Sequence, residues 1–596
     1  MMSPFPDNNP YNFIPFGPPV RFSPAPPSLK RLQGLSGTIT LHLTNETPML
    51  VAQRVNPEDQ IPPKLENFKI NGKLALPGTA IKGMLRSVLE AVTNACFVIF
   101  DGERLDYRMA TQEALHLKAG RITRMPGDGQ DGEIEEMDRA WIAMPGNNQI
   151  KAMVKGKPQS ITLATVPAGT VSGQEVWVKG IAAPAYINSR GNQIPAPSGS
   201  FNLVTDIRTR PTTGFSKAVY KITAQSINNK KRDRVFVYKS RAPRYSFSAA
   251  EVEDYNTVLA GQLTEHQKRG GFDLTEDQKL AVGALVYFLE EGGRAVRLSR
   301  VEIPRTRYDS SRADRLPRAY NDAYHKCTDP DHLCAACQLF GFVADIHGAR
   351  GRITVTDAQW LSGPGELDQF FPLKVLGEPH PTSYNFYLID PHNANKVRNY
   401  DGRPITDNRG RLGQPAGDVQ LRGRKFYFHH PLKDWAAYRC PDPHQFRRVL
   451  NEVKPLQPGN KFKFHVHFRN LSNAELGLLL YCLILESNLR HKLGLARALG
   501  FGTVKLECQS LLLNRDGDRY ASLDASLLDE TDNIQRYIDT FKAAVPQSNP
   551  EGVSFDDLEN VKKLRKILDP SQAPANPYYP GFAWYRDHKD KALQKL

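Results

Sequence analysis

Apolar and polar residues alternate in two long runs, one near each end of the chain. The run GTITLHLTNETPML begins at Gly37, and the run KFKFHVHFRNL begins at Lys461. Successive side chains of a strand point to opposite faces of a sheet, so each run predicts a strand, the first of them half-buried.

Each strand is followed by a helical pattern. The first helix is predicted in LPGTAIKGMLRSVLEAVTNACF, whose apolar positions are Ile81, Leu85, Val88, Leu89 and Val92. Before the second helix, Ser472 is the expected N-cap and Glu475 stands at the capping-box position. The apolar run 476–486 is a predicted core helix, because a membrane span needs roughly 20 residues.

Each half of this pattern reads as one β-α-β unit, built from a strand, a helix, a glycine turn and a strand. Two such units predict an α+β fold with a ferredoxin-like (RRM-like) palm. Between the two halves lies a large insertion that we expect to be β-rich, with a helix in LTEDQKLAVGALVYFLEEG. Further on, the strand-like runs NFYLID and RKFYFHHP flank a glycine-rich loop and predict a protruding β-hairpin.

This reading divides the chain of 596 residues into seven segments. They are a flexible proline-rich arm (1–34), the first half of the palm (35–100), the insertion (101–320), a cysteine-rich loop with a palm strand (321–362), a thumb-like hairpin region (363–455), the second half of the palm (456–515) and a helical extension (516–596). The arm lacks the apolar stretch of a secretory signal.

Three of the seven cysteines, Cys327, Cys334 and Cys337, fall within eleven positions. Such a cluster predicts a structural zinc site with three cysteines and one histidine. Spacing alone allows either His325 or His332. We prefer His325, because His332 is too near Cys334 in sequence to reach a separate corner of the tetrahedron. The scattered remaining cysteines argue against a disulfide framework and for a reducing cytoplasm.

The chain is basic, with 78 lysines and arginines against 63 acidic residues and a net charge of +15. The excess gathers in the segments 208–244, 294–318 and 396–425, where arginine outnumbers lysine and aromatic residues are interleaved. One such run is often only a solvated surface. Three of them favour nucleic acid as a partner, because guanidinium groups bind phosphates and aromatic rings stack on bases.

Two segments combine glycine with positive charge. At the start of the first helix, LPGTAIKGMLR places Gly78 and Thr79 where backbone N–H groups and the helix dipole attract an anion, and Lys82 and Arg86 follow on one face. Near the end of the palm, HKLGLARALGFG offers glycines for close backbone approach, with charge from its neighbours. Its members are His491, Lys492, Gly494, Arg497, Gly500 and Gly502. Alone, each segment also fits a plain surface helix or a tight turn.

Together these segments resemble the CRISPR-associated RAMP superfamily. LPGTAIKGMLRSVLEA is similar to its strand-to-helix motif, CAACQLFGF with GRITVTDA to its cysteine-rich motif, and HKLGLARALGFGTVKL to its C-terminal glycine-rich signature, in the same order. The likeness is to the guide-RNA-binding backbone subunits of type III effector complexes, in a variant with a long insertion. It implies a palm with a β-hairpin thumb and a zinc-pinned loop. It also implies guide RNA, target RNA and other effector subunits as partners, and no membrane.

The resemblance also implies that an acidic residue after the first strand can cleave target RNA with the help of a divalent ion such as Mg²⁺. Where relatives are rich in glycine, this chain has NETPMLVAQRVNPEDQIPPKLEN. The candidates there are Asp59 and Glu58, followed by Glu46 and Glu66. A solvated turn residue is the competing interpretation of Asp59.

Two other functions remain open at this stage. The chain could be a non-catalytic subunit that caps the complex. It could also be a stand-alone endoribonuclease that processes guide precursors, which would need a general acid and a general base in one pocket. His42, His465 and His467 are available, but their strand patterns favour ordinary strand histidines. In every case we expect the protein to work in the cytoplasm.

Overall fold

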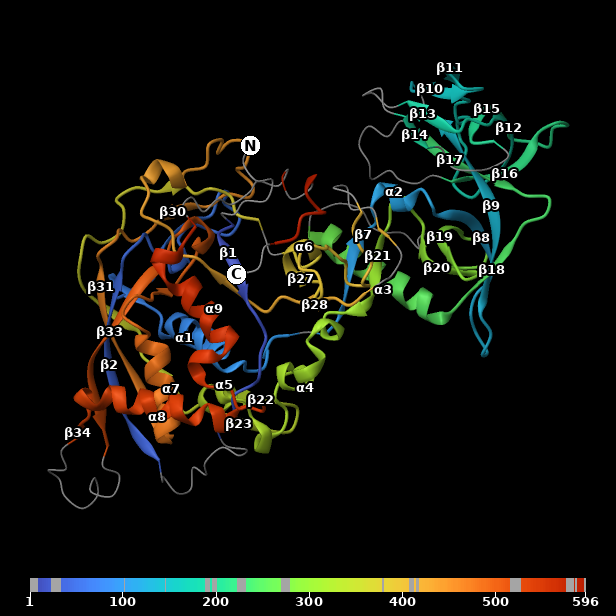
Figure 1. Ribbon diagram of the computed structural model, residues 1–596. Coiled ribbons are helices and arrows are strands. Elements are labelled where there is room, and N and C mark those ends of the chain that lie inside the picture. Colours follow the sequence, from blue (N-terminus) through green and yellow to red (C-terminus); the bar gives the residue numbers. More distant parts are fainter. Residues whose placement is uncertain are drawn as a thin grey trace. The chain divides into compact units, whose positions relative to one another are not determined.

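The computed structural model describes residues 9–22, 34–100, 102–144, 146–187, 193–195, 201–221, 232–268, 279–377, 380–406, 412–413, 417–514, 527–574, 584 and 587–593 (Figure 1). The chain divides into two compact units. The first comprises Met1–Glu103, Arg312–Gly402 and Ala416–Leu596, and the second comprises Arg104–Ser311 and Arg403–Pro415. Both contain helices and many strands, which confirms the predicted α+β class.

The first unit is built on a large sheet with the strand order β32-β33-β2-β31-β25-β6-β5, to which β24 and β34 add at β31 and β33. The strands are β2 (Leu35–Asn45), β5 (Lys69–Ile70), β6 (Lys73–Leu76), β24 (Ile353–Val355), β25 (Ala358–Ser362), β31 (Lys461–Leu471), β32 (His491–Lys492), β33 (Thr503–Leu513) and β34 (Leu528–Asp529). All pairings in this sheet are antiparallel.

Two helices connect the long strands and cover one face of the sheet. Helix α1 (Gly78–Thr93) lies in sequence between β2 and β24, and α7 (Asn473–Ile484) lies between β31 and β33. In Figure 1 both helices lie against the same side of these strands. Alternate residues of β2 and β31, such as Leu41 and Phe464, are fully buried in one core with the apolar residues of both helices. The alternation in the sequence therefore predicted which face is covered.

Local sequence sets the ends of both helices. The Ser472 side chain accepts a hydrogen bond from the Glu475 backbone at 3.2 Å, and the Glu475 carboxylate accepts one from the Ser472 backbone at 2.9 Å. The predicted capping box is thus confirmed. Helix α1 ends at Asn94, which adopts a left-handed conformation with φ of 48°.

A buried ion pair joins α7 to the segment before β24. The Arg352 guanidinium contacts the Glu475 carboxylate with both terminal nitrogens, one of them at 3.1 Å. The same guanidinium donates to the carbonyl groups of Gln338 at 3.0 Å and Asn470 at 2.7 Å. Arg352 and Glu475 are each about nine-tenths or more buried. The Glu475 side chain thus caps a helix and neutralises a buried cation.

The remaining elements of the first unit pack around this core. The helices are α4 (Asn321–Tyr324), α5 (Ala335–Phe340), α6 (Tyr384–Tyr387), α8 (Ile534–Ala544) and α9 (Glu559–Leu568). The smaller strands are β1 (Tyr11–Ile14), β3 (Ala52–Arg54), β4 (Lys64–Asn67), β22 (Gly341–Val343), β23 (Gly348–Arg350), β26 (Phe371–Pro372), β27 (Leu388–Ile389), β28 (Gln420–Leu421), β29 (Arg424–Tyr427) and β30 (Glu452–Lys454).

The N-terminal arm and the thumb-like region differ from their predicted form. Strand β1 of the arm pairs with β29, and Phe13 and Ile14 are buried, so residues 9–22 pack onto the unit. The rest of the predicted arm lies outside the described residues, apart from Gly34. The runs NFYLID and RKFYFHHP do not pair with each other: β27 pairs with β28, while β29 is taken by β1.

The second unit is rich in strands. Its large sheet has the order β15-β12-β16-β17-β9-β18-β20-β19-β8, and a smaller sheet has the order β11-β10-β13-β14. The elements are β7 (Arg104–Arg108), α2 (Thr111–Ala114), β8 (Lys118–Arg124), β9 (Gly132–Ala143), β10 (Gln149–Val154), β11 (Lys157–Thr162), β12 (Glu175–Ile181), β13 (Ala185–Ile187), β14 (Gln193–Pro195), β15 (Leu203–Arg208), β16 (Ser216–Lys221), β17 (Arg232–Tyr238), β18 (Arg244–Phe247), α3 (Ala249–Lys268), β19 (Leu285–Glu291), β20 (Arg294–Ser299) and β21 (Arg305–Ser311).

One predicted helix of this unit is wrong. The apolar end of LTEDQKLAVGALVYFLEEG forms strand β19, which pairs with β20 and β8. The tight turn Gly292–Gly293, in which both glycines have positive φ, joins β19 to β20. Valine, tyrosine and phenylalanine pack well between strands, and pairing on both sides outweighs the helical spacing of the apolar residues. Residues 274–278 of the predicted helix lie outside the described residues.

Candidate metal centre and nucleic-acid interface

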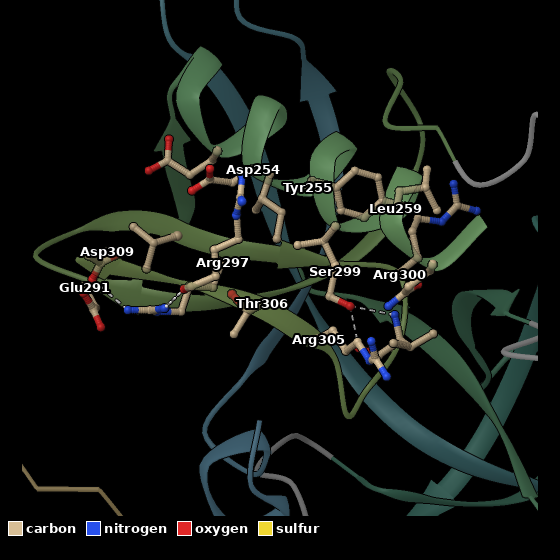
Figure 2. A pocket seen from close by; sticks show the side chains of 17 residues that line it. Asp254, Tyr255, Leu259, Glu291, Arg297, Ser299, Arg300, Arg305, Thr306 and Asp309 are labelled. Atoms are coloured by element: carbon tan, nitrogen blue, oxygen red, sulfur yellow. Dashed lines mark hydrogen bonds and ion pairs between the residues drawn. The ribbon is translucent and has the colours of Figure 1, made fainter. Parts of the chain in front are cut away.

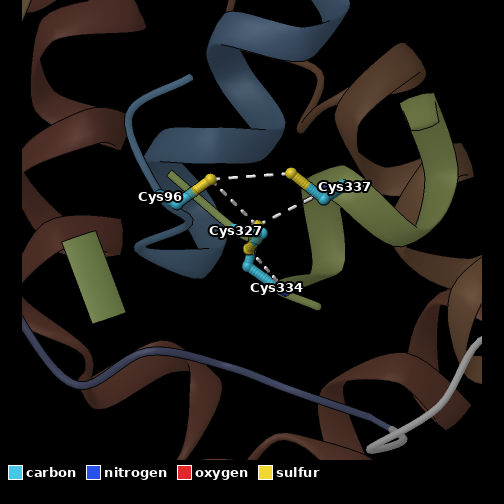
Figure 3. A group of neighbouring side chains, drawn as sticks. All are labelled: Cys96, Cys327, Cys334 and Cys337. Atoms are coloured by element: carbon cyan, nitrogen blue, oxygen red, sulfur yellow. Dashed lines mark hydrogen bonds between the residues drawn. The ribbon is translucent and has the colours of Figure 1, made fainter. Parts of the chain in front are cut away.

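Four cysteines meet in the core of the first unit. Cys334 is the N-cap of α5, and its sulfur accepts a hydrogen bond from the Cys337 backbone at 3.5 Å. Cys327 lies in the loop before, where its sulfur accepts from the Cys334 backbone at 3.4 Å. The fourth member is Cys96, which follows the end of α1 (Figure 3). These N–H···S bonds hold the sulfurs of Cys327 and Cys334 next to the backbone at the start of α5.

The four sulfur atoms all lie within 4.8 Å of one another. Cys96 Sγ is 3.5 Å from Cys337 Sγ and 3.6 Å from Cys334 Sγ. A tetrahedral Zn²⁺ with Zn–S bonds of about 2.3 Å would separate its sulfurs by roughly 3.8 Å. The donor set and its dimensions therefore fit a tetrahedral Cys₄ zinc site.

The site suits a structural metal better than a catalytic one. All four cysteines are buried, and Cys96 is fully so. Hydrogen bonds among the four sulfurs hold the pKa of Cys334 well below its ordinary value and raise the pKa of Cys96 and Cys337, because thiols this close stabilise one thiolate at the expense of its neighbours. Four protein ligands fill a tetrahedron and leave no position for a water or substrate. Bound zinc would tie the end of α1 to the start of α5 and supply no open coordination position for catalysis.

The predicted fourth ligand, His325, is corrected by this arrangement. His325 is exposed at the end of α4 and is not a member of the group. His332 is also exposed, and its Nδ1 lies 2.6 Å from the Asp329 carboxylate. Cys96 takes the fourth corner because the end of α1 passes beside the cysteine loop. The cysteine in VTNACF, directly after the first helix, was the available signal.

Two arginines, Arg424 of β29 and Arg86 of α1, lie near the thiol group and meet at Glu90. Arg424 is buried, contacts the carbonyl of Ala95, and donates to the carbonyl of Cys96 at 3.3 Å. It also pairs with Glu90 at 3.1 Å, and Arg86 pairs with the same carboxylate at 2.7 Å. The guanidinium groups hold the backbone that carries Cys96. Their positive charge would also offset the negative charge of four thiolates.

The start of α1 is less open to an anion than its sequence predicts. The Gly78 backbone N–H donates to the Asp357 carboxylate at 2.7 Å, so an acidic side chain of this chain already occupies that donor. Thr79 is exposed. Lys82 donates to the carbonyl of Ile353 at 3.2 Å, and burial together with the Arg86 guanidinium lowers the pKa of Lys82. Of the four predicted residues, Thr79 is the most accessible to a ligand.

The C-terminal glycine loop is shaped by close backbone contacts. Gly494 and Gly502 have φ values of 91° and 78°, and a Cβ at these positions would lie 2.5 Å and 1.9 Å from carbonyl oxygens of Leu50 and Leu493. No other residue fits there. Gly500 also has a positive φ, of 100°, and its carbonyl accepts from the Thr47 hydroxyl at 2.9 Å. The loop is thereby fixed against the segment that follows β2.

Two predicted RNA-binding residues of this loop are buried. The Lys492 ammonium donates to the carbonyls of Gly500 and Phe501 at 3.2 and 3.1 Å, and burial lowers its pKa to about 7. His491 is bonded to the carbonyl of Leu483, and burial lowers its pKa to about 4. Both side chains stabilise the loop through these buried hydrogen bonds to backbone carbonyls. Arg497 is exposed, and its guanidinium lies 5.2 Å from the centre of the Tyr427 ring.

Asp59 and Glu58 lie in the loop between β3 and β4, whereas Glu66 lies in β4 and Glu46 directly follows β2. The Arg54 guanidinium organises this loop by donating to the carbonyls of Pro57, Glu58 and Gln60 at 2.6 to 2.9 Å. Asp59 and Glu58 are exposed on it. By contrast, Glu46 pairs with Arg490 at 2.8 Å and Glu66 with Lys69 at 3.2 Å.

Comparison with known proteins does not assign the chain to a family. No protein-family model matches the sequence, and no curated protein matches it. Among solved structures, the crystal structure of Csc2 from Thermofilum pendens is similar at 14% identity, over 43% of this chain and 55% of that chain, with a TM-score of 0.13. The match thus spans about half of the Csc2 chain. A TM-score of this size carries no conclusion about fold or function.

The second unit has a pocket between α3 and the strands β20 and β21 (Figure 2). Its cavity volume is about 130 Å³, and its wall carries four carboxylates and four guanidinium groups. Several are paired within the wall: Arg297 contacts the Asp309 carboxylate at 2.8 Å and the Arg307 carbonyl at 2.7 Å. The balanced charges favour neither an anion nor a cation. In the described ranges, no helix is both long and apolar enough to cross a membrane.

Proposed function

We propose that this chain is a guide-RNA-binding subunit of the RAMP type in a type III CRISPR effector complex of the cytoplasm. The strand order of the first unit carries this proposal. Its four central strands lie in the order β33-β2-β31-β25, with α1 and α7 in the two connections. Numbered along the chain, this is the order 4-1-3-2 of a ferredoxin-like palm, the layout of RNA-binding RRM domains.

The positions of the three motifs support the same function. The glycine-to-helix motif begins α1, the cysteine cluster of Cys327, Cys334 and Cys337 contributes three of four thiols, and the glycine loop contacts the segment after β2. Thus all three belong to one unit and pack on one core. This arrangement suits a scaffold that holds RNA-facing loops around a palm, with target RNA and other effector subunits as further partners.

The test is guide retention by the assembled complex. We expect complex purified with a CRISPR array to contain guide RNA of discrete length. The double variant Thr79→Glu/Arg497→Glu should weaken guide binding by about tenfold or more, because two carboxylates then face phosphates at exposed sites. Retention is measured by quantifying extracted RNA per complex, and affinity by filter binding.

The matched control is Lys562→Glu/Lys566→Glu, which introduces two carboxylates on the exposed side of α9. This variant should retain guide RNA like the natural sequence. If the complex assembles without RNA, or if both double variants lose it equally, the proposed function is wrong.

We further propose Asp59 as the residue that would hold a Mg²⁺ ion or orient the attacking 2′-hydroxyl if the subunit cleaves target RNA. Its place on the loop organised by Arg54 supports this choice, because Glu46 and Glu66 are engaged in ion pairs. The competing function is a non-catalytic capping subunit. The capping function is favoured because the loop after β2 contains no glycine, whereas the resemblance implies a glycine-rich loop there.

Asp59→Ala should abolish one target-cleavage position, with a loss of about a hundredfold or more in rate, because a metal ligand or positioning group is removed. Cleavage products of labelled target RNA are resolved on a sequencing gel. Glu58→Ala tests the second candidate of the same loop: loss of the cleavage position in Glu58→Ala but not in Asp59→Ala would assign the role to Glu58. An unchanged product pattern in both variants would favour the capping subunit.

A further inference from the structure

The face of the large sheet that α1 and α7 leave uncovered carries an uninterrupted row of basic and imidazole side chains. Along β31 the outward positions are Lys461, Lys463, His465, His467 and Arg469, while the alternate residues between them are buried. His465 is half-buried and the other four side chains are exposed. Each step of two residues along a strand advances about 6.7 Å. The five outward side chains thus form a line with cations at both ends and two imidazole rings between them.

The two imidazoles are held in position by the neighbouring strand. The Nδ1 atom of His467 lies 3.0 Å from the Thr38 hydroxyl, and that of His465 lies 3.2 Å from the Thr40 hydroxyl, both on β2. The rings lie nearly parallel, with an angle of 21° and 6.2 Å between their centres. Because Nδ1 of each ring faces a threonine, the ring plane is fixed before any ligand arrives.

Negative charge beside this row is scarce. On β2 the outward positions are Thr38, Thr40, His42 and Thr44, which carry no carboxylate. On β33, Glu507 is exposed and pairs with Lys505 at 2.7 Å. Asp357, after β24, turns to the helix-covered side, where it accepts from the Gly78 backbone. Across β2, β31 and β33 the uncovered face is therefore strongly positive.

We infer that this face binds single-stranded RNA along β31, with Lys461, Lys463 and Arg469 contacting phosphates and His465 and His467 stacking on bases. The charge complements a polyanion, and parallel, preoriented rings suit unpaired bases, for which histidine is an established stacking partner. The choice of RNA over DNA rests on the proposed function. The surface itself uses none of the residues predicted to contact the guide. It thus adds a second RNA contact to the same unit.

The experiment measures fluorescence anisotropy of a labelled oligouridine with the purified full chain over a range of salt concentrations. Lys461→Gln/Lys463→Gln/Arg469→Gln should bind about tenfold or more weakly at moderate salt. Its plot of log affinity against log salt should flatten by about 2, since each lost phosphate contact on a single strand contributes about 0.7. His465→Gln/His467→Gln should bind about fivefold or more weakly with an unchanged salt slope, because stacking carries no counterion release.

The control Lys562→Gln/Lys563→Gln/Lys566→Gln removes the same charge from α9. It should bind like the natural sequence. All variants alter exposed or half-buried side chains outside the core, so their melting temperatures should stay within about 2 °C. Equal weakening in the β31 and α9 variants would overturn the inference, and equal affinity for single-stranded DNA would overturn the assignment to RNA. Guide loss in Thr79→Glu/Arg497→Glu is scored separately, so each proposal fails on its own variant.

Discussion

Cys96→Ser should release zinc from the protein and destabilise the first unit. The natural chain should contain about one zinc ion, measured by plasma mass spectrometry. The variant should lose most of it, because a hydroxyl is a poor zinc ligand and three thiols leave the tetrahedron open. The melting temperature should fall by on the order of 10 °C, since metal-binding free energy contributes directly to folding.

Two histidine variants serve as matched controls. His325→Ala and His332→Ala should keep a full equivalent of zinc, because both side chains are exposed and outside the four-cysteine group. Cys508→Ser, a cysteine of β33 away from the group, should also keep it. A strong chelator should lower the melting temperature of the natural chain toward that of Cys96→Ser. Zinc retained in Cys96→Ser but lost in His325→Ala would show that the predicted histidine is the ligand.

The second large effect is expected from Arg352→Met. Removing the guanidinium leaves the buried Glu475 carboxylate without its ionic partner, and the carbonyls of Gln338 and Asn470 without their donor. Breaking a buried ion pair on one side costs about 3–5 kcal/mol of unfolding free energy. Urea unfolding of the first unit, followed by circular dichroism, measures this loss.

Arg352→Met/Glu475→Gln provides the matched comparison. Glutamine keeps the capping box of α7 but carries no charge, so the double variant should regain part of the lost free energy. A double variant less stable than Arg352→Met would show that the negative charge of Glu475 stabilises the start of α7 even without the arginine, and that the unpaired carboxylate is not the cause of the loss.

Sequence patterns predicted the elements that depend on neighbouring residues. The alternating runs became β2 and β31, the amphipathic run became α1, and Ser472 with Glu475 caps α7 as expected. These predictions hold because strand alternation, helical spacing and caps are set by residues a few positions apart. Strand β19 shows the limit: its apolar spacing fits a helix, but pairing with β8 and β20 decides otherwise.

The candidate site was predicted in part. Three sulfurs of the metal group follow from the spacing of Cys327, Cys334 and Cys337. The fourth, Cys96, lies more than two hundred residues earlier and is brought in only when α1 packs beside α5. Lys492 and His491 show the opposite case: in the sequence they are cations beside glycines, yet the fold buries both.

By itself, the sequence determined the α+β class, the long strands β2 and β31, the helices α1 and α7, three members of the thiol cluster and the excess of positive charge. Only the tertiary structure decided which cysteine completes the cluster, which cations are buried inside the glycine loop and which form a row on β31. The reason is physical. Local propensity and spacing act along the chain, whereas metal coordination, burial of charge and the composition of a sheet face depend on which distant segments pack together.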